Sequence, residues 1–182
     1  MNISFDEKRI TDQDLTIRVR SAVPKEVEFS LILAHGAGAG MDSPFMRFFQ
    51  QNLPEKGVKV TEFNFGYIEA GKKAPAPRKK LESEWRVVIE NELETFDKNI
   101  PIFIGGKSMG GRIASYILPE YSHLSGLVFL GYPLHPPGKP DNQRAEHLFK
   151  IQKPMLFISG TKDRLAQLDL LESVVEKIGT RA

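Results

Sequence analysis

The residues best suited to chemistry in this sequence surround Ser108. Glycines stand two positions before and two positions after this serine, in the segment Gly106-Lys107-Ser108-Met109-Gly110, which follows an apolar stretch. Small residues at these positions let a chain turn sharply from a strand into a helix, and they hold the central residue in a strained conformation with its side chain exposed. The dipole of the following helix favours negative charge on a reacting oxygen. The pattern therefore predicts that Ser108 is a nucleophile.

The triplet Gly106-Lys107-Ser108 also resembles the end of a phosphate-binding P-loop. A P-loop would need glycine at position 101, where the sequence has Pro101, and its loop would replace the apolar residues 101–106. The sequence therefore favours a nucleophile over a phosphate loop.

A glycine-rich loop, HGAGAG at residues 35–40, follows a second apolar stretch. Loops rich in glycine bring backbone N–H groups close to a ligand. Hydrolysis through an acyl-enzyme needs two such donors for the tetrahedral oxyanion, and we assign them to Met109 and Ala37. Gly36 would then border the pocket, and His35 would order the loop by hydrogen bonding. The alternative is that the loop is only a flexible turn before a helix.

An acid, Asp163, follows a third apolar stretch, residues 154–160. A carboxylate at the end of a strand, after the serine in chain order, suits the acid of a catalytic triad, which holds the histidine tautomer and stabilises the imidazolium. The alternative is that Asp163 only caps the last helix.

Short apolar runs alternate with longer amphipathic stretches along the chain. Strands are expected at residues 15–20, 27–35, 58–65, 100–105, 126–134 and 154–160, and helices at 44–52, 81–96, 108–118 and 164–178. This alternation predicts an α/β fold, with a mainly parallel sheet and helices on both faces. In such sheets the site lies beyond the carboxyl ends of the strands. Trp85 lies at helical spacing and is expected in the core.

The composition sets broad limits. The chain has 182 residues, a formal net charge of +2 and no cysteine. These values suit a single domain spanning residues 1–182, with no disulfides, and they give no reason to expect nucleic acid as a partner. The polar N-terminus is not a secretory signal, and no apolar run is long enough to span a membrane. We expect a cytoplasmic protein with a small-molecule substrate. No residue spacing indicates a metal site.

Four segments together resemble a known family: HGAGAG, GGKSMGGRIAS, GYPLHPPGKP and ISGTKDRLA. They are similar to the small lidless α/β-hydrolases related to dienelactone hydrolase, and within these to a branch described as KAT-complex-subunit-like. The resemblance implies an α/β-hydrolase fold, Ser108 as nucleophile, Asp163 as acid, Met109 and Ala37 as oxyanion donors, and no organic cofactor. Only about fifteen residues separate GYPLHPPG from PMLFISG, which leaves no room for a cap domain.

The resemblance fails at the histidine, which in the family follows the acid. All four histidines, at positions 35, 123, 135 and 147, precede Asp163. His123 is expected at the surface and His147 in solvent, whereas His135 follows a strand and is a candidate to line the pocket or to replace the base. We expect that the chain is truncated and lacks the last edge strand and helix. The alternative is a natural relative without the histidine. Either way, the chain as given is expected to be nearly inactive.

Two functions follow from these features. The first is a serine hydrolase that cleaves small carboxylic esters or thioesters through an acyl-enzyme intermediate. The second is a non-catalytic binding or scaffold protein built on a hydrolase fold. A basic, proline-containing loop at residues 71–80 is expected to lie over the site, where it would attract an anion or remain solvated.

Overall fold

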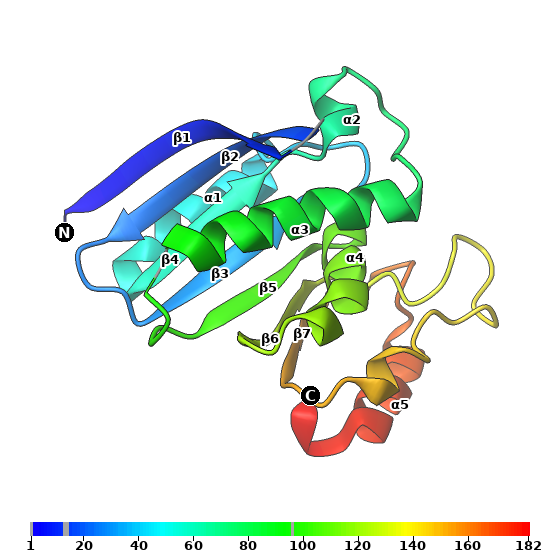
Figure 1. Cartoon of the computed structure of the whole chain (residues 1–182). Coiled ribbons are helices and arrows are strands. Elements are labelled where there is room, and N and C mark those ends of the chain that lie inside the picture. Colours follow the sequence, from blue (N-terminus) through cyan, green and yellow to red (C-terminus); the bar gives the residue numbers. More distant parts are fainter. Residues whose placement is uncertain (1, 13–14, 96) are drawn as a thin grey trace.

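One seven-stranded sheet organises the described part of the chain, residues 2–12, 15–95 and 97–182 of the computed structural model. Its strands lie in the order β1-β2-β4-β3-β5-β6-β7 (Figure 1). They are β1 (Ile3–Asp12), β2 (Leu15–Pro24), β3 (Phe29–Ala34), β4 (Val58–Phe63), β5 (Ile102–Lys107), β6 (Leu124–Leu130) and β7 (Met155–Ile158). β1 with β2 and β2 with β4 pair antiparallel, and the remaining pairs are parallel. The predicted mainly parallel sheet is confirmed.

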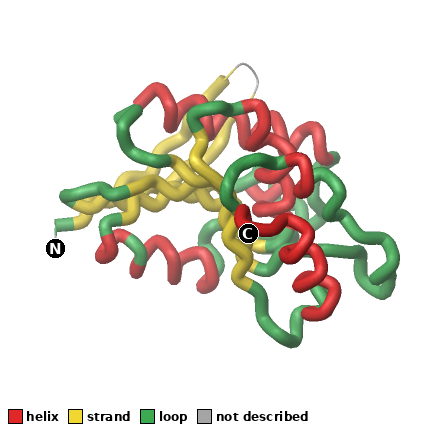
Figure 2. Tube along the Cα trace, turned by 90° about the horizontal axis from the view of Figure 1, so that it is seen from below, coloured by secondary structure: helices red, strands yellow, loops and turns green. Residues whose placement is uncertain are grey.

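Helices lie on both faces of this sheet (Figure 2). The α-helices are α1 (Pro44–Asn52), α2 (Gly66–Glu69), α3 (Arg78–Thr95), α4 (Met109–Ile117) and α5 (Leu168–Ile178), and single 3-10 turns are η1 (Pro54–Lys56), η2 (Leu118–Glu120), η3 (Leu148–Lys150) and η4 (Gly179–Arg181). None of the helices in the described residues combines the length and apolar character that a membrane span requires.

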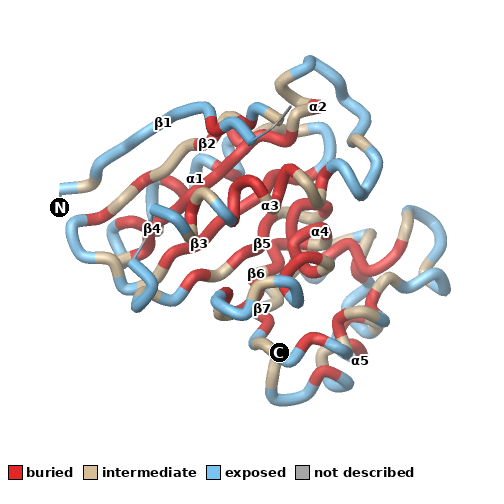
Figure 3. Tube along the Cα trace, viewed as in Figure 1, coloured by how far each residue is buried: buried red, intermediate tan, exposed pale blue. Residues whose placement is uncertain are grey.

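Each face of the sheet has its own apolar core. α3 and α4 pack on one face, where Trp85 is fully buried and its ring lies 4.8 Å from that of Phe63 in an edge-to-face arrangement. α1 packs on the other face, where Met46 contacts a smaller cluster around Leu33 and Val60. The central strands are therefore buried on both sides (Figure 3), as expected for their continuous apolar runs.

The structure departs from the predicted elements at both ends of the chain, at the start of α3 and at the strand predicted over 126–134, which ends at Leu130 as β6. β1 has no apolar alternation that would reveal it, because Ile10 is its one buried residue among those described. α5 starts at Leu168, later than the predicted 164, because turns occupy the preceding residues. α3 starts at Arg78 rather than at 81, and its predicted end at 96 lies outside the described residues.

A partly buried ionic cluster ties Met41 and Asp42, which follow the glycine-rich loop, to the sheet. The Arg20 guanidinium donates to Glu62 Oε2 and to Asp42 Oδ1 at 2.9 Å each, and to the Met41 carbonyl at 2.8 Å. Glu62 is fully buried on β4, and one of its oxygens has no hydrogen-bond partner among the described residues. Burial prevails over Arg20 and raises the pKa of the Glu62 carboxyl to about 7.

Glu62 gives folding stability a specific pH dependence. Its folded pKa lies above the unfolded value of 4.5, so folding favours the protonated carboxyl, and the contribution of this group weakens as the pH rises from 4.5 through about 7. Relative to Glu62→Gln, the wild-type chain should lose on the order of 2 kcal/mol of unfolding free energy between about pH 4.5 and pH 7.5. Urea denaturation at both pH values measures this difference.

Glu120→Gln provides the control for this experiment. Arg86 lowers the pKa of Glu120, so this carboxyl stabilises the fold above its unfolded pKa. The Glu120→Gln variant should therefore still lose unfolding free energy between about pH 4.5 and pH 7.5, at least as much as the wild type does. Equal pH dependence in the wild type and in Glu62→Gln would contradict the assignment.

Candidate active site

Ser108 lies at a sharp turn between β5 and α4. Its backbone has φ 48° and ψ −112°, and it is the one non-glycine residue with positive φ in the described chain. Such a conformation costs about 1–3 kcal/mol and persists only where the surrounding structure enforces it. Here the Ser108 N–H donates to the Leu130 carbonyl at the end of β6 at 3.1 Å, and the Ser108 carbonyl accepts from Arg112 at 3.1 Å. The turn has the geometry of a nucleophile elbow.

The glycines on either side of Ser108 let this turn approach β3. A Cβ added to Gly106 would lie 2.1 Å from the Ala34 carbonyl oxygen, and one added to Gly110 would lie 2.3 Å from the same atom. Gly106 also has φ of 150°, a value that other residues rarely adopt. The tight contact places the elbow directly beside the start of the glycine-rich loop.

His35 holds that loop in place. It is fully buried, and its Nε2 accepts a hydrogen bond from the Phe65 N–H at 3.1 Å. Because Nε2 is the acceptor, Nδ1 carries the proton and donates to the Gly36 carbonyl at 2.8 Å. Burial also lowers the pKa of His35, which favours the neutral ring. With both nitrogens engaged, His35 is placed to order the loop.

A pocket of 270 Å³ opens at the elbow and brings together three of the predicted residues, Ser108, Met109 and Ala37. Within the part of the chain described here, the N–H groups of Ala37 and Met109 donate to no other protein group. Both are thus available to a ligand. The pocket is lined by Ala37, Pro75, Ala76, Arg78, Leu81, Ser108, Met109, Arg112, Ile113, Pro133, Arg144 and Leu165. A larger hollow of 430 Å³ lies at the amino end of β5, near Ile102 and His123, away from Ser108.

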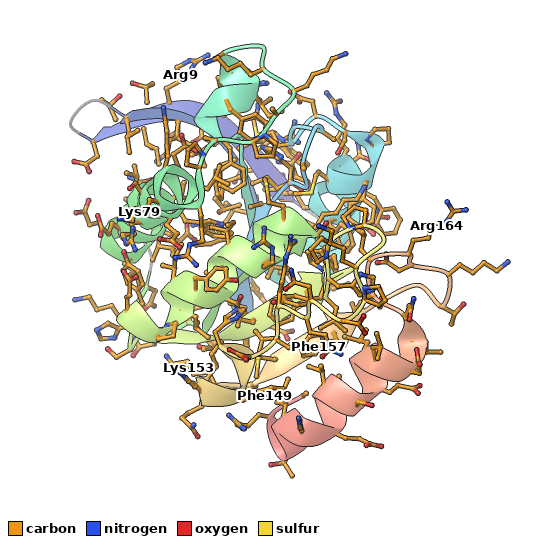
Figure 4. The ribbon with its side chains drawn as sticks, turned by 90° about the vertical axis from the view of Figure 1, so that its right-hand side faces the viewer. Arg9, Lys79, Phe149, Lys153, Phe157 and Arg164 are labelled. Atoms are coloured by element: carbon orange, nitrogen blue, oxygen red, sulfur yellow. The ribbon has the colours of Figure 1, made fainter. Side chains whose placement is uncertain are left out.

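Asp163 lies on the turn after β7, beside the end of β6. Its Oδ1 accepts from the Leu165 N–H at 2.9 Å, and its Oδ2 lies 3.3 Å from the position of a Cβ on Gly131. Asp163 is half-buried, and it starts no helix because α5 begins only at Leu168. The next residue, Arg164, is exposed on the loop that leads to α5 (Figure 4). Asp163 itself does not line the pocket, although Leu165 does.

The structure departs from two expectations about histidines. His135 does not line the pocket; it is 2% exposed, with Nδ1 at 2.9 Å from the Pro136 carbonyl and a backbone N–H that donates to Leu165 at 3.2 Å. His147 is half-buried rather than solvated: its ring stacks on Tyr116 at 4.0 Å. His123 is exposed as expected. The polar sequence around His147 hides its burial, because that burial comes from α4.

Lys107 also lies outside the pocket lining. Its Nζ sits 4.5 Å above the Phe45 ring, and its aliphatic stem lies against Gly36. Lys107 thus contacts the glycine-rich loop from the side of α1. Within the residues described, no group of three or more His, Asp or Glu side chains is arranged to hold a metal ion.

Three arginines share the pocket with Ser108: Arg78, from the basic loop that the sequence placed over the site, and Arg112 and Arg144, which the sequence patterns do not single out. Arg112 has a local signal, since it follows Ser108 by one helical turn and must lie on the same side of α4. Arg144 lies in the long connection between β6 and β7, and no local pattern indicates that it returns to the serine. Pro75 and Ala76 bring the basic loop, residues 71–80, to the pocket edge.

Comparison with known proteins agrees with this geometry. The sequence pattern of the family described as "Alpha/beta hydrolase domain" matches residues 27–181. An α/β serine hydrolase homologue from Coxiella burnetii has a similar structure, with a TM-score of 0.77 and 17% identity over 96% of this chain and 83% of its own. A lidless α/β serine hydrolase from Xanthomonas campestris has a TM-score of 0.78 and 16% identity, over 97% of this chain and 80% of its own. A dienelactone hydrolase from Anabaena variabilis has a TM-score of 0.73 and 18% identity, over 97% of this chain and 82% of its own.

At these identities the solved structures establish the fold, and the family match establishes the membership. The seven-stranded sheet, the elbow at Ser108 and the glycine-rich loop are placed as that fold requires. The chain belongs to the family of α/β hydrolase domains.

Proposed function

We propose that this protein is a serine hydrolase that acts on small carboxylic esters or thioesters through an acyl-enzyme intermediate. The observation that carries the proposal is the strained elbow at Ser108, which opens into one pocket with the N–H groups of Ala37 and Met109. The pocket volume of 270 Å³ and its open rim favour short acyl groups, because a longer chain would find little apolar surface to bury against.

In the proposed reaction the Ser108 hydroxyl oxygen attacks the carbonyl carbon of the substrate. The carbonyl oxygen becomes an oxyanion that accepts hydrogen bonds from Ala37 and Met109, and the alcohol or thiol then leaves with a proton. Water attacks the acyl-serine in the same way and releases the carboxylic acid. Asp163 is proposed as the acid of the site, whose role in a catalytic triad is to orient a histidine base; no histidine of the described residues contacts Asp163, so here the Ser108 proton would pass through water to the leaving group.

The proton of Ser108 has no histidine to receive it in the pocket as it stands. The four histidines of the chain are at positions 35, 123, 135 and 147, and none of them lines the pocket. A serine without a base is a weak nucleophile. We therefore expect slow acylation and very slow turnover from this chain.

The absence of a histidine beside Ser108 supports a second candidate function, a binding or scaffold protein that uses the hydrolase fold without turnover. The resemblance of the sequence segments to the KAT-complex-subunit-like branch also favours a binding or scaffold function, because the name of that branch refers to a subunit of a complex. The two candidates differ in whether Ser108 can be acylated at all.

Covalent labelling tests this difference. A fluorophosphonate probe should form one adduct, on Ser108, slowly and over hours, and the adduct should be absent from Ser108→Ala. Intact-mass and peptide mass spectrometry locate the modified residue. Ser159→Ala is a matched control, since it removes a serine hydroxyl outside the pocket lining and should leave labelling unchanged. No adduct on Ser108 would overturn the hydrolase proposal and leave the binding function.

The glycines of the elbow should be intolerant of a methyl group. Gly110→Ala would place its Cβ 2.3 Å from the Ala34 carbonyl oxygen, so β3 or the elbow must move. We expect a loss of about 2–3 kcal/mol of unfolding free energy, together with loss of probe labelling. Gly160→Ala is the control, because its Cβ would meet no atom within 4 Å and its φ is ordinary. Equal stability of the two variants in urea denaturation would show that the close contact is not needed.

A further inference from the structure

The pocket at Ser108 is strongly cationic. Three guanidinium groups line it, from the start of α3 (Arg78), from α4 (Arg112) and from the connection between β6 and β7 (Arg144), whereas no acidic residue is among its lining. These side chains come from three separate parts of the chain, so their convergence is a property of the tertiary structure.

Two of the three charges lack a counter-ion. Arg78 pairs with Glu82 at 3.1 Å, but Arg112 and Arg144 form no ion pair with any described residue. The Nε of Arg112 is buried without a hydrogen-bond partner in the same part of the chain. Burial and the nearby Arg112 lower the pKa of Arg144, which shows that the two half-buried cations repel each other. Such an arrangement costs free energy unless a ligand supplies negative charge.

Neutral groups contact two of the three arginines, Arg144 and Arg78. Two hydrogen bonds hold the backbone of Arg144. Its N–H donates to the Leu134 carbonyl at 2.7 Å, and its carbonyl accepts from the Tyr132 hydroxyl at 2.7 Å. The Arg78 guanidinium lies 4.8 Å above the Tyr116 ring.

His147 completes this support without adding charge. It stacks on Tyr116, and its Nε2 lies 2.7 Å from the Ser115 hydroxyl. Burial, with the charges of Arg112 and Arg78, lowers the pKa of His147 to about 4, so the ring is neutral near pH 7. The charges of Arg112 and Arg144 are therefore left without a counter-ion among the described residues.

We propose that Arg112 and Arg144 bind a phosphate group carried by the substrate, with Arg78 at the pocket rim. Two unpaired guanidiniums match the double negative charge of a phosphate monoester better than the single charge of a carboxylate, and their planar donor pairs suit its oxygens. Because Ser108 shares the pocket, the phosphate lies on the same small molecule as the ester or thioester. The last step rests on the proposed hydrolase function; the phosphate site does not.

Calorimetric titration with inorganic phosphate tests the site without requiring catalysis. The wild type and Ser108→Ala should bind phosphate equally, and Arg112→Gln and Arg144→Gln should each weaken binding about tenfold or more. Arg112→Lys and Arg144→Lys keep the charge and should bind better than the glutamine variants, which guards against misfolding as the cause. Arg86→Gln removes one arginine of α3 that pairs with Glu120 outside the pocket, and it should bind as the wild type does. Unchanged affinity in both glutamine variants would overturn the proposal.

Protection of Ser108 from the fluorophosphonate probe tests the link to the substrate. Added 2-acetoxyethyl phosphate should slow labelling more than 3-acetoxypropionate, and both more than neutral 2-acetoxyethanol. Equal protection by all three, or stronger protection by the carboxylate, would overturn the phosphate assignment. If Ser108 takes no label but phosphate titration succeeds, the hydrolase proposal fails and the phosphate site stands.

Discussion

The contact of the elbow glycines with Ala34 is the constraint on which the whole site depends. The hypothetical Cβ atoms of Gly106 and Gly110 both collide with the same carbonyl oxygen, at 2.1 Å and 2.3 Å. This approach joins β5 and α4 to the end of β3 and so brings Ser108 next to the loop that starts at His35. The serine, the Ala37 N–H and the Met109 N–H can share one pocket only because no side chain separates these backbones.

The glycine-rich loop itself is held from two directions. At its start, His35 bridges the Gly36 carbonyl and the Phe65 N–H, which ties the loop to the chain after β4. Directly after its end, Arg20 binds Asp42 and the Met41 carbonyl and ties this part of the chain to β2. A segment with so many glycines would lose much conformational entropy on ordering, and these hydrogen bonds, of which those of His35 are buried, offset that loss. Preorganised donors are what oxyanion stabilisation requires.

The pocket carries positive charge that the described part of the chain does not neutralise, which favours an anionic ligand. Apart from Arg78 and Glu82 at its rim, the ion pairs of the described residues involve no residue of the pocket lining; examples are Arg20 with Glu62 between β2 and β4, and Lys59 of β4 with Glu92 of α3. At the pocket, Tyr132 holds the backbone of Arg144 and the Tyr116 ring lies against Arg78, while Arg112 and Arg144 have no counter-ion among the described residues. The phosphate proposal and the hydrolase fold together describe a small, open site for a short, charged ester.

The sequence by itself determined the local features of this protein. The alternation of apolar runs and amphipathic stretches predicted the parallel strands and the helices, because side-chain periodicity follows directly from backbone geometry. The spacing of Gly106, Ser108 and Gly110 predicted the elbow, because the steric limits of a sharp turn act over a few residues. β1 escaped prediction because its exposed edge position requires no apolar face.

The tertiary structure alone decided which distant side chains meet. Arg144 lines the same pocket as Ser108, His147 is half-buried and stacks on Tyr116, and His135 is buried outside the pocket lining. These positions depend on the path of the connection between β6 and β7, which carries no regular periodicity and takes its course from contacts with α4 and with the turn after β7. Such contacts join residues far apart in the chain, so spacing along the sequence cannot encode them.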